Sequence, residues 1–329
     1  MGTSIVNMKI LVILGPTATG KTDLALFLAK KFNGELVSCD SRQVYIGLDI
    51  GTGKMPSEKF KVQSEKLKKE SRWWEIDGVK IWMYDVVDPK KQYTVANYVK
   101  DADKVIKKIC ANGKLPIVVG GTGLYLKALL EGLPNLIVPL DLKLRKELEK
   151  LPLGELQKRL QKISTKKWKD MNNSDRQNPR RLIRAIEIVI LSKTHFDSSS
   201  KTKRAADILK IGLTAAREIL YQRIDERVIK RIDQGMITEA KSLHTKGLIL
   251  KRMRSLGLEY RVLADYLEGE IGNIKELIKI LQGKIHHYAK RQITWFKKEK
   301  GVNWFDITDE NYPVKVENLI TKWYDLSYA

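Results

Sequence analysis

The sequence predicts an α/β fold, in which a parallel sheet core carries a phosphate-binding loop and is interrupted by a mostly helical insertion domain. Three observations predict this fold. Short apolar runs alternate with helical stretches in the first third of the chain, a glycine-rich loop joins the first run to the first helix, and a basic stretch without strands follows. Strands that alternate with helices are typical of parallel sheets.

The strands of the first third are predicted from four short apolar runs, at 9–14, 35–39, 81–87 and 115–119. The stretch 57–72 is rich in Lys and Glu and predicts a surface helix or loop. These segments form the first part of the core, residues 1–134.

A change of pattern from about Asn135 predicts the helical insertion domain, residues 135–205. Short basic helices there are punctuated by prolines, and the domain ends in a polar, Ser-rich loop at 195–203. Residues 206–329 return to the core with basic C-terminal helices. We expect strands at 207–213 and 302–305, and helices at 215–232, at 235–246 and onward to about 299.

Composition narrows the class of partner. The chain has 329 residues, a net charge of +22 and a hydrophobic fraction of 43%, so it is long and apolar enough to fold and favours polyanionic partners. A generic Lys-rich surface would give a similar charge. No apolar run approaches the roughly 20 residues of a membrane span. With two cysteines there is neither a disulfide framework nor a four-ligand zinc pattern. We expect a cytoplasmic monomer that does not enter a membrane.

The strongest motif is a complete G-x-x-x-x-G-K-[ST] loop between the apolar run 10–14 and a helical stretch that begins near Leu24. A strand, this loop and a helix make a P-loop NTPase-like phosphate site, where backbone N–H groups surround the anion. Lys21 would reach the outer phosphate, and the Thr22 hydroxyl would bind Mg²⁺. The expected diphosphate-binding residues are Gly15, Pro16, Thr17, Ala18, Thr19, Gly20, Lys21 and Thr22.

Polar residues follow two further strand ends. Ligands of open α/β sheets bind at the carboxyl ends of the strands, so Asp40 after the second run would point toward the phosphate loop. It could act as a general base, orient Mg²⁺ or simply cap a helix. Ser41, Arg42 and Gln43 suit a base edge or a phosphate, and Thr122 in the turn Gly120–Gly123 faces the same edge or has a steric role.

Two arginine series have helical spacing. Arg180 and Arg181 each share a helix face with Arg184, and Arg223 shares one with Arg227, which suits a row of phosphates or a solvated helix surface. The basic segment 284–298 contains Tyr288, Trp295 and Phe296, which could stack on RNA bases or belong to the core.

Together these motifs resemble the tRNA dimethylallyltransferase family, also called tRNA isopentenyltransferases or IPP transferases. The matching segments occur in family order and spread over most of the chain: GPTATGKT (15–22), SCDSRQVYIGLDIGTGK (38–54), YTVANYVKDA (93–102), PIVVGGTGLYLKALLEGL (116–133), DRQNPRRLIRAIEIV (175–189) and YAKRQITWFK (288–297).

The resemblance implies transfer of a dimethylallyl group from dimethylallyl diphosphate to N6 of adenosine 37 in the anticodon stem-loop of tRNA. The P-loop would then hold the donor's diphosphate with Mg²⁺, and Lys21 and Arg223 would neutralise its charge. Asp40 would be the base, and Thr122 would lie at the target nucleotide. The implied tRNA contacts are Asp40, Ser41, Arg42, Gln43, Thr122, Arg145, Arg180, Arg181, Leu182, Ile183 and Arg184.

Some positions depart from the family pattern. Thr19 stands where Ser is common and Gly53 where Ala is common, and we expect both to be tolerated because all these residues are small. His195-Phe196-Asp197 replaces a Gly-Lys-Pro-like turn, and we expect no C-terminal zinc finger of the kind that some members carry. Two other functions share the P-loop: a small-molecule or nucleotide kinase, and an RNA-binding NTPase. A kinase has no need of the high charge or the basic C-terminal helix, whereas the RNA-binding NTPase would use the loop as a switch.

Overall fold

The computed structural model describes residues 8–55, 67–70, 72–133, 135–136, 138–195 and 206–325. The chain divides into two units, one formed by residues 1–129 and 205–329 and the other by residues 130–204. The sequence placed the insertion at 135–205. No helix in the described ranges is long and apolar enough to cross a membrane.

The larger unit contains an eight-stranded mixed sheet with the strand order β3-β4-β5-β2-β6-β1-β7-β8. Most neighbouring strands are parallel, and only the β3–β4 and β4–β5 pairs are antiparallel. The strands are β1 (Lys9–Leu14), β2 (Gly34–Ser38), β3 (Leu67–Glu70), β4 (Trp73–Ile76), β5 (Val79–Trp82), β6 (Leu115–Gly120), β7 (Asp207–Thr214) and β8 (Val302–Asp306).

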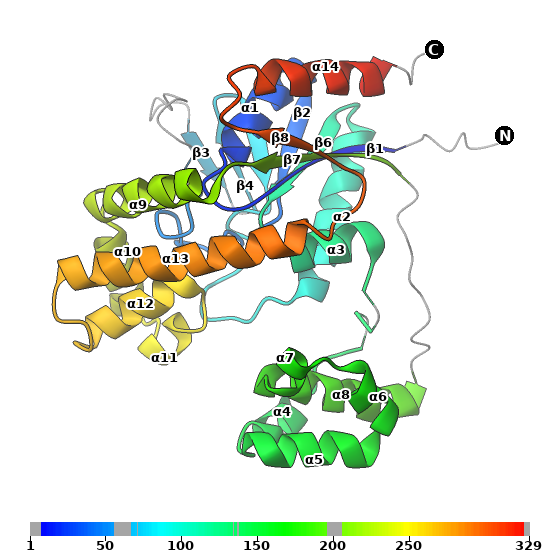
Figure 1. Ribbon diagram of the computed structural model, residues 1–329, viewed down its shortest axis with the longest axis vertical. Helices are drawn as coiled ribbons and strands as arrows, with labels where there is room; N and C mark the ends of the chain where they lie inside the picture. The colour runs from blue at the N-terminus through cyan, green and yellow to red at the C-terminus, as the bar shows by residue number, and fades with distance from the viewer. Residues whose placement is uncertain are drawn as a thin grey trace. The chain divides into compact units, whose positions relative to one another are not determined.

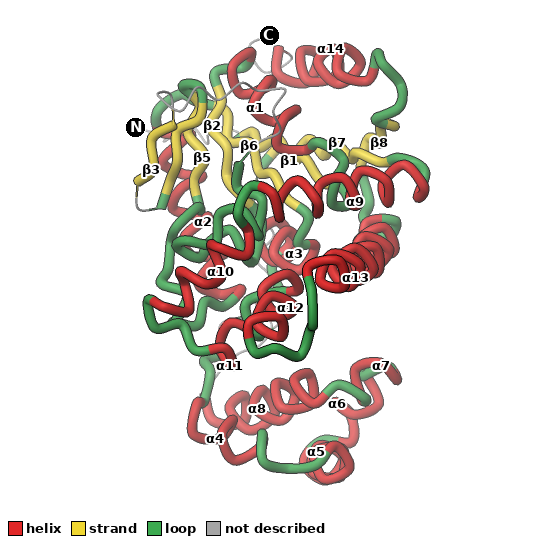
Figure 2. Tube along the Cα trace, turned by 90° about the vertical axis from the view of Figure 1, so that its left-hand side faces the viewer, coloured by secondary structure: helices red, strands yellow, loops and turns green. Residues whose placement is uncertain are grey.

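Helices cover both faces of this sheet. In Figures 1 and 2, α1 and α14 lie on one face, and α2, α3 and α13 lie on the other. The helices of the larger unit are α1 (Lys21–Lys31), α2 (Val95–Ala111), α3 (Gly123–Glu131), α9 (Arg217–Asp233), α10 (Met236–Thr245), α11 (Leu250–Met253), α12 (Leu258–Leu267), α13 (Ile274–Phe296) and α14 (Tyr312–Asp325).

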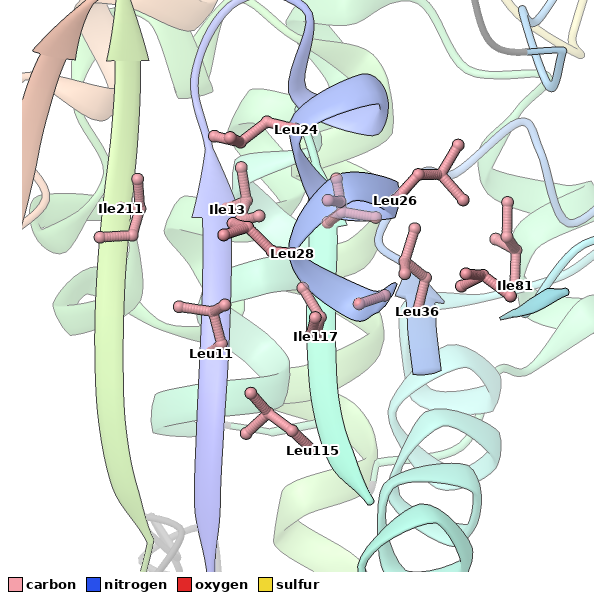
Figure 3. Packing of buried hydrophobic residues seen from close by; sticks show 14 of the residues in the cluster. Leu11, Ile13, Leu24, Leu26, Leu28, Leu36, Ile81, Leu115, Ile117 and Ile211 are labelled. Atoms are coloured by element: carbon pink, nitrogen blue, oxygen red, sulfur yellow. The ribbon is translucent and has the colours of Figure 1, made fainter. Parts of the chain in front are cut away.

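The core under α1 explains why the central strands read as continuous apolar runs. A parallel sheet covered by helices is buried on both faces, so successive strand residues are apolar rather than alternating. Leu24 and Leu28 of α1 pack over Ile13 of β1 and Ile117 of β6 (Figure 3), and all four are buried. This packing fixes α1, and with it the loop that precedes the helix.

The smaller unit consists of helices alone. Its core includes Leu156, Leu160, Leu182 and Ile186, which are at most 1% exposed. Its helices are α4 (Leu142–Leu148), α5 (Leu153–Ile163), α6 (Thr165–Asp170), α7 (Asn173–Arg176) and α8 (Pro179–His195).

The structure differs from the sequence-based expectations in four places. Residues 67–70 form β3 of a β3–β4–β5 meander rather than a surface helix or loop, and the rest of that stretch, 57–66 and 71, lies outside the described residues. The strand expected at 81–87 is β5, which ends at Trp82 because Met83 and Asp85 have positive φ. Helix α14 had not been expected. The polar loop was expected at 195–203, but His195 is the last residue of α8, and the rest of that loop, 196–203, is outside the described residues.

Candidate active site

Three loops follow the carboxyl ends of β2, β6 and β1, which are neighbours in the sheet. They are the turn after β2 that begins at Asp40, the glycine turn 120–123 after β6, and the P-loop 15–22 after β1. Close backbone approach holds them together: a Cβ atom at Gly120 would lie 2.2 Å from the Cys39 carbonyl oxygen. The strand order therefore brings the predicted site residues 15–22, 40–43 and 122 to one edge.

The P-loop leaves the N-terminus of α1 open. Its N-cap, Gly20, has a φ of 79° and makes no side-chain cap hydrogen bond. By contrast, α2 begins with a capping box in which the Thr94 side chain accepts a hydrogen bond from the Asn97 N–H. Uncapped N–H groups at a helix N-terminus are an anion-binding site, because they and the helix dipole both favour negative charge.

Gly15 is required at the start of the loop. A Cβ atom there would lie 2.3 Å from the Leu213 carbonyl oxygen of β7, and its φ of 141° also disfavours other residues. Within the loop, Thr19 Oγ1 donates to the Pro16 carbonyl at 3.0 Å, a bond that a serine could also form. Lys21 Nζ donates to the same carbonyl at 2.6 Å.

Helix α9 adds arginines to the loop. Arg227 donates from Nη2 to Thr17 Oγ1 at 2.6 Å, and a Cβ atom at Gly20 would lie 3.9 Å from Arg223 Nη2. One turn further, Arg231 donates to the Gly51 carbonyl at 3.3 Å. The three arginines are four residues apart, so they share one face of α9. Sequence reasoning placed only Arg223 at the diphosphate; Arg231 was missed, although its spacing continues the series.

The positively charged side chains around the P-loop lower one another's pKa values. Burial and the neighbouring Arg227 lower the pKa of Lys21 to about 7, although Asp40 opposes the shift. Burial, with the charges of Arg231 and Arg223, lowers the pKa of Arg227 to about 9. Burial also lowers the pKa of Arg231. Cations crowded together out of water are stabilised by a bound polyanion, so the electrostatics agree with a diphosphate ligand.

Only one carboxylate oxygen of Asp40 accepts hydrogen bonds from the described residues. Its Oδ1 accepts hydrogen bonds from the backbone N–H groups of Arg42 at 2.7 Å and Gln43 at 3.4 Å. Among the described residues, Oδ2 accepts none. Asp40 therefore caps its own turn through one oxygen and leaves the other without a hydrogen bond from the described residues. Thr122 lies next to this turn, because the Ser41 N–H donates to Thr122 Oγ1 at 3.3 Å.

The other residues of this turn brace the surrounding loops. Gln43 Oε1 accepts from Ser38 Oγ at 2.7 Å, and its Nε2 donates to the Gly53 carbonyl at 3.2 Å. Arg42 Nη1 donates to the Ser255 carbonyl at 3.4 Å. Their expected tRNA contacts stay predictions.

Gly53 is more constrained than the sequence suggested. Its φ is 66°, and a Cβ atom there would lie 1.8 Å from Arg231 Nη2. Alanine at position 53 would therefore force the Arg231 guanidinium away from Gly51. The expectation that glycine is tolerated at this position stays a prediction, since the structure shows only that alanine would need the Arg231 side chain to move.

Within the smaller unit, Arg145 and Arg184 converge on the fully buried Glu187. Arg145 donates from Nε and Nη2 at 2.9 and 2.8 Å, and Arg184 donates from Nη1 at 2.5 Å. Arg184 Nη2 also donates to the carbonyls of Val138 and Asn135. Burial opposes ionisation of Glu187, but the hydrogen bonds from both arginines outweigh it and lower its pKa. These contacts hold the segment before α4 against α8.

The rest of the predicted tRNA run divides by exposure. Arg180 and Arg181 are exposed, and Arg181 forms an ion pair with Asp175. Leu182 and Ile183 are 0% and 6% exposed and pack in the core of the smaller unit. In the C-terminal basic segment of the larger unit, Phe296 is a core residue and Trp295 is 41% exposed.

A magnesium ion would depend on the ligand for most of its coordination. In the described part of the chain, no group of three or more His, Cys, Asp or Glu side chains could hold a metal ion. Thr22, the expected ligand, is partly exposed in the first turn of α1. Mg²⁺ in such sites takes few protein ligands and completes its shell with phosphate oxygens and water. The donor set fits an ion that arrives with a diphosphate.

Comparisons with known proteins match most of the chain. The sequence model of the IPP transferase family matches residues 43–299, and that of the isopentenyl transferase family matches residues 8–75. A tRNA dimethylallyltransferase 2 from Treponema denticola is 42% identical over 300 residues, covering 89% of this chain and 94% of that protein. A tRNA dimethylallyltransferase from Bacillus mycoides is 36% identical over 309 residues, covering 92% and 90%.

Solved structures share the fold. The full-length tRNA isopentenylpyrophosphate transferase from Bacillus halodurans gives a TM-score of 0.68 at 33% identity, covering 98% of both chains. A eukaryotic dimethylallyltransferase acting on tRNA gives a TM-score of 0.75 at 24% identity, covering 97% of this chain and 80% of the other. The latter likeness concerns the fold alone.

Proposed function

The chain belongs to the tRNA dimethylallyltransferase (IPP transferase) family and has that activity, and we propose that it transfers the dimethylallyl group to N6 of adenosine 37 in the anticodon stem-loop. The donor would be dimethylallyl diphosphate. One observation carries the proposal: the uncapped N-terminus of α1, surrounded by cations, shares the sheet edge with Asp40 and Thr122.

The P-loop would hold the diphosphate of the donor. Cleavage of the allylic C–O bond leaves positive charge on a delocalised carbon and negative charge on the departing diphosphate. Lys21, Arg223 and the backbone N–H groups of the loop would stabilise that leaving group, which is the main electrostatic task of the site. Arg227, which is partly buried and donates a hydrogen bond to Thr17, extends this set beyond the residues expected from the sequence.

Asp40 would assist the acceptor. The exocyclic amine of adenine is a weak nucleophile, so its placement beside a carboxylate matters. As N6 forms its bond to the carbon and the C–O bond breaks, Asp40 Oδ2 would take the N6 proton. Thr122 would lie at the target nucleotide and help to orient it. Because adenine in an anticodon loop is stacked, the base would have to be flipped out of the loop.

Magnesium would be held by Thr22 together with the diphosphate. The ion would neutralise charge on the diphosphate oxygens, as metal ions do in phosphoryl sites. Thr22 is suited to this role because it opens α1 directly after Lys21.

The positive surface would bind tRNA. The exposed Arg180 and Arg181 suit direct phosphate contacts, whereas Arg145 and Arg184 would act chiefly by holding α8 and the segment before α4 in shape. Ser41, Arg42 and Gln43 would line the acceptor side of the edge. We propose that the enzyme works as a cytoplasmic monomer.

A single-turnover assay tests the proposal. The protein, Mg²⁺ and labelled dimethylallyl diphosphate are mixed with an anticodon stem-loop that carries unmodified adenosine 37. We expect label on that adenosine and none when guanosine replaces it. Label elsewhere, or none at all beside phosphate release from ATP, would contradict the proposal and favour a kinase or NTPase.

A further inference from the structure

Helix α13 contacts the glycine turn after β6 through three side chains to which the proposed reaction gives no role. The Tyr288 side chain lies near Thr122, which opposes the rise that burial causes in the pKa of Tyr288. Gln292 Nε2 donates to the Gly121 carbonyl at 2.8 Å. Trp295 lies against Gly123, where a Cβ atom would come within 2.1 Å of its Nε1. The three side chains are spaced so that they share one face of the helix.

Of these three, Gln292 also reaches the P-loop. Its Oε1 accepts a hydrogen bond from the Thr17 N–H at 2.8 Å, and its side chain is buried, with 6% exposed. A carboxamide has a donor and an acceptor at the two ends of one rigid plane. One buried side chain thus connects the loop proposed to hold the donor with the turn that carries Thr122.

This connection matters because the reaction depends on distance. Effective transfer requires the reacting atoms to be held about 3–3.5 Å apart, with the orbitals aligned. An allylic carbon that loses its diphosphate without the amine in place is captured by water. In that side reaction the C–O bond to diphosphate breaks, water forms a new C–O bond, and dimethylallyl alcohol, diphosphate and a proton result.

We infer that Gln292 is a positioning residue that sets the spacing between the donor loop and the acceptor turn, so that the allylic carbon meets the adenine amine rather than water. This inference rests on the proposed function. Gln292 acts through Thr17 and Gly121 and does not itself touch the reacting atoms.

Donor binding does not depend on this bridge. Thr17 is also held through its hydroxyl by Arg227, at 2.6 Å. Among the described residues, Gln292 makes no hydrogen bond with Lys21 or with the open N-terminus of α1, so we expect both to keep their geometry without it. Loss of the Gln292 amide therefore leaves the anion site intact and releases the acceptor turn. Loss of this amide should therefore lower turnover without changing the affinity for the donor.

The test compares Gln292→Met with Gln282→Met. Methionine has a similar size to glutamine but cannot form either hydrogen bond. Gln282 lies on the same helix, is partly exposed and makes no hydrogen bond with the described residues. With labelled dimethylallyl diphosphate and the stem-loop, both alcohol and modified RNA are counted. For Gln292→Met we expect donor Kd within threefold of wild type, kcat at least tenfold lower, and the ratio of hydrolysis to transfer at least tenfold higher.

Gln282→Met should match the wild type in all three quantities. A lower kcat and a lower Tm for Gln292→Met with an unchanged hydrolysis-to-transfer ratio would overturn the inference, because a merely structural role predicts that result. A similar change in ratio for Gln282→Met would overturn it too. Absence of transfer by the wild type would instead refute the proposed function.

Gln292→Glu provides a second variant that keeps the acceptor for Thr17. Its carboxylate repels the Gly121 carbonyl when ionised, but it can donate to that carbonyl when protonated. We expect its hydrolysis-to-transfer ratio, divided by that of the wild type at each pH, to fall toward one as the pH is lowered. A relative ratio that does not vary with pH would contradict the bridge.

Discussion

Raising the pH from 7.5 to 8.5 is expected to weaken donor binding about tenfold, because Lys21 must take up a proton when the diphosphate binds. Burial and the neighbouring Arg227 lower the pKa of Lys21 to about 7 in the free protein. A bound diphosphate raises this pKa, since an opposite charge favours the ammonium form. Below pH 7 Lys21 is already charged in both states and contributes no pH dependence.

The magnitude follows from proton linkage. Above pH 7 Lys21 is neutral in the free protein and charged in the complex. Donor binding therefore takes up one proton, and the affinity for the donor falls as the pH rises. The loss is about 1.4 kcal/mol, or tenfold in Kd, per pH unit until the pH reaches the pKa of Lys21 in the complex. A phosphate monoester loses its second proton near pH ~6, so the charge of the donor is constant over this range. Arg227, with a pKa of about 9, stays mostly charged.

Isothermal titration with a non-reacting thiolo analogue of the donor measures this effect. Lys21→Arg is the matched control, because a guanidinium remains charged throughout and its Kd should be flat from pH 7.5 to 8.5. A flat Kd for the wild type, or an equal slope for Lys21→Arg, would refute the assignment of the proton to Lys21.

Three further predictions address other parts of the proposed site. Asp40→Asn keeps an oxygen to cap the turn but cannot take a proton, so single-turnover kcat should fall about 10²–10⁴-fold while donor Kd stays unchanged; weakened donor binding with normal turnover would contradict the base. Glu187→Gln should destabilise the smaller unit by about 3 kcal/mol, at the low end for a broken buried pair because Arg145 is 22% exposed; urea unfolding followed by hydrogen exchange within 138–195 measures it, and unchanged protection would contradict it. Arg180→Ala should reduce the slope of log K for tRNA against log salt by about 0.7–0.9, the share of one phosphate; an identical slope would remove Arg180 from the interface.

The parts of the fold that were predicted from sequence are those encoded by neighbouring residues. The buried strands appear as short apolar runs, and the P-loop is a continuous motif between one of them and α1. By contrast, β3 has the sequence LKKE, which lacks an apolar pattern, and it is a strand because it pairs with β4. Pairing between strands compensates for weak local preference, and a single sequence does not display it.

The residues of the candidate site likewise differ in whether the sequence alone could reveal them. Lys21, Asp40 and Thr122 could be selected because each follows a predicted strand end, and the rule for ligands in α/β sheets concerns strand ends. Arg231 and Gln292 could not be selected, since their partners at Gly51, Thr17 and Gly121 are far away in sequence. Arg184 had the helical spacing expected of a phosphate contact, yet its guanidinium donates hydrogen bonds to Glu187 and to nearby backbone carbonyls.

By itself the sequence determined the α/β class, the phosphate loop and the family, because these depend on residue type at short spacing. Only the tertiary structure decided which cations face the P-loop, which oxygen of Asp40 is left without a hydrogen bond, and which side chain joins the P-loop to the glycine turn after β6. The physical reason is that charge, burial and hydrogen-bond partners depend on distances across the fold. Those distances are set by the order of β2, β6, β1 and β7 and by the packing of α9 and α13.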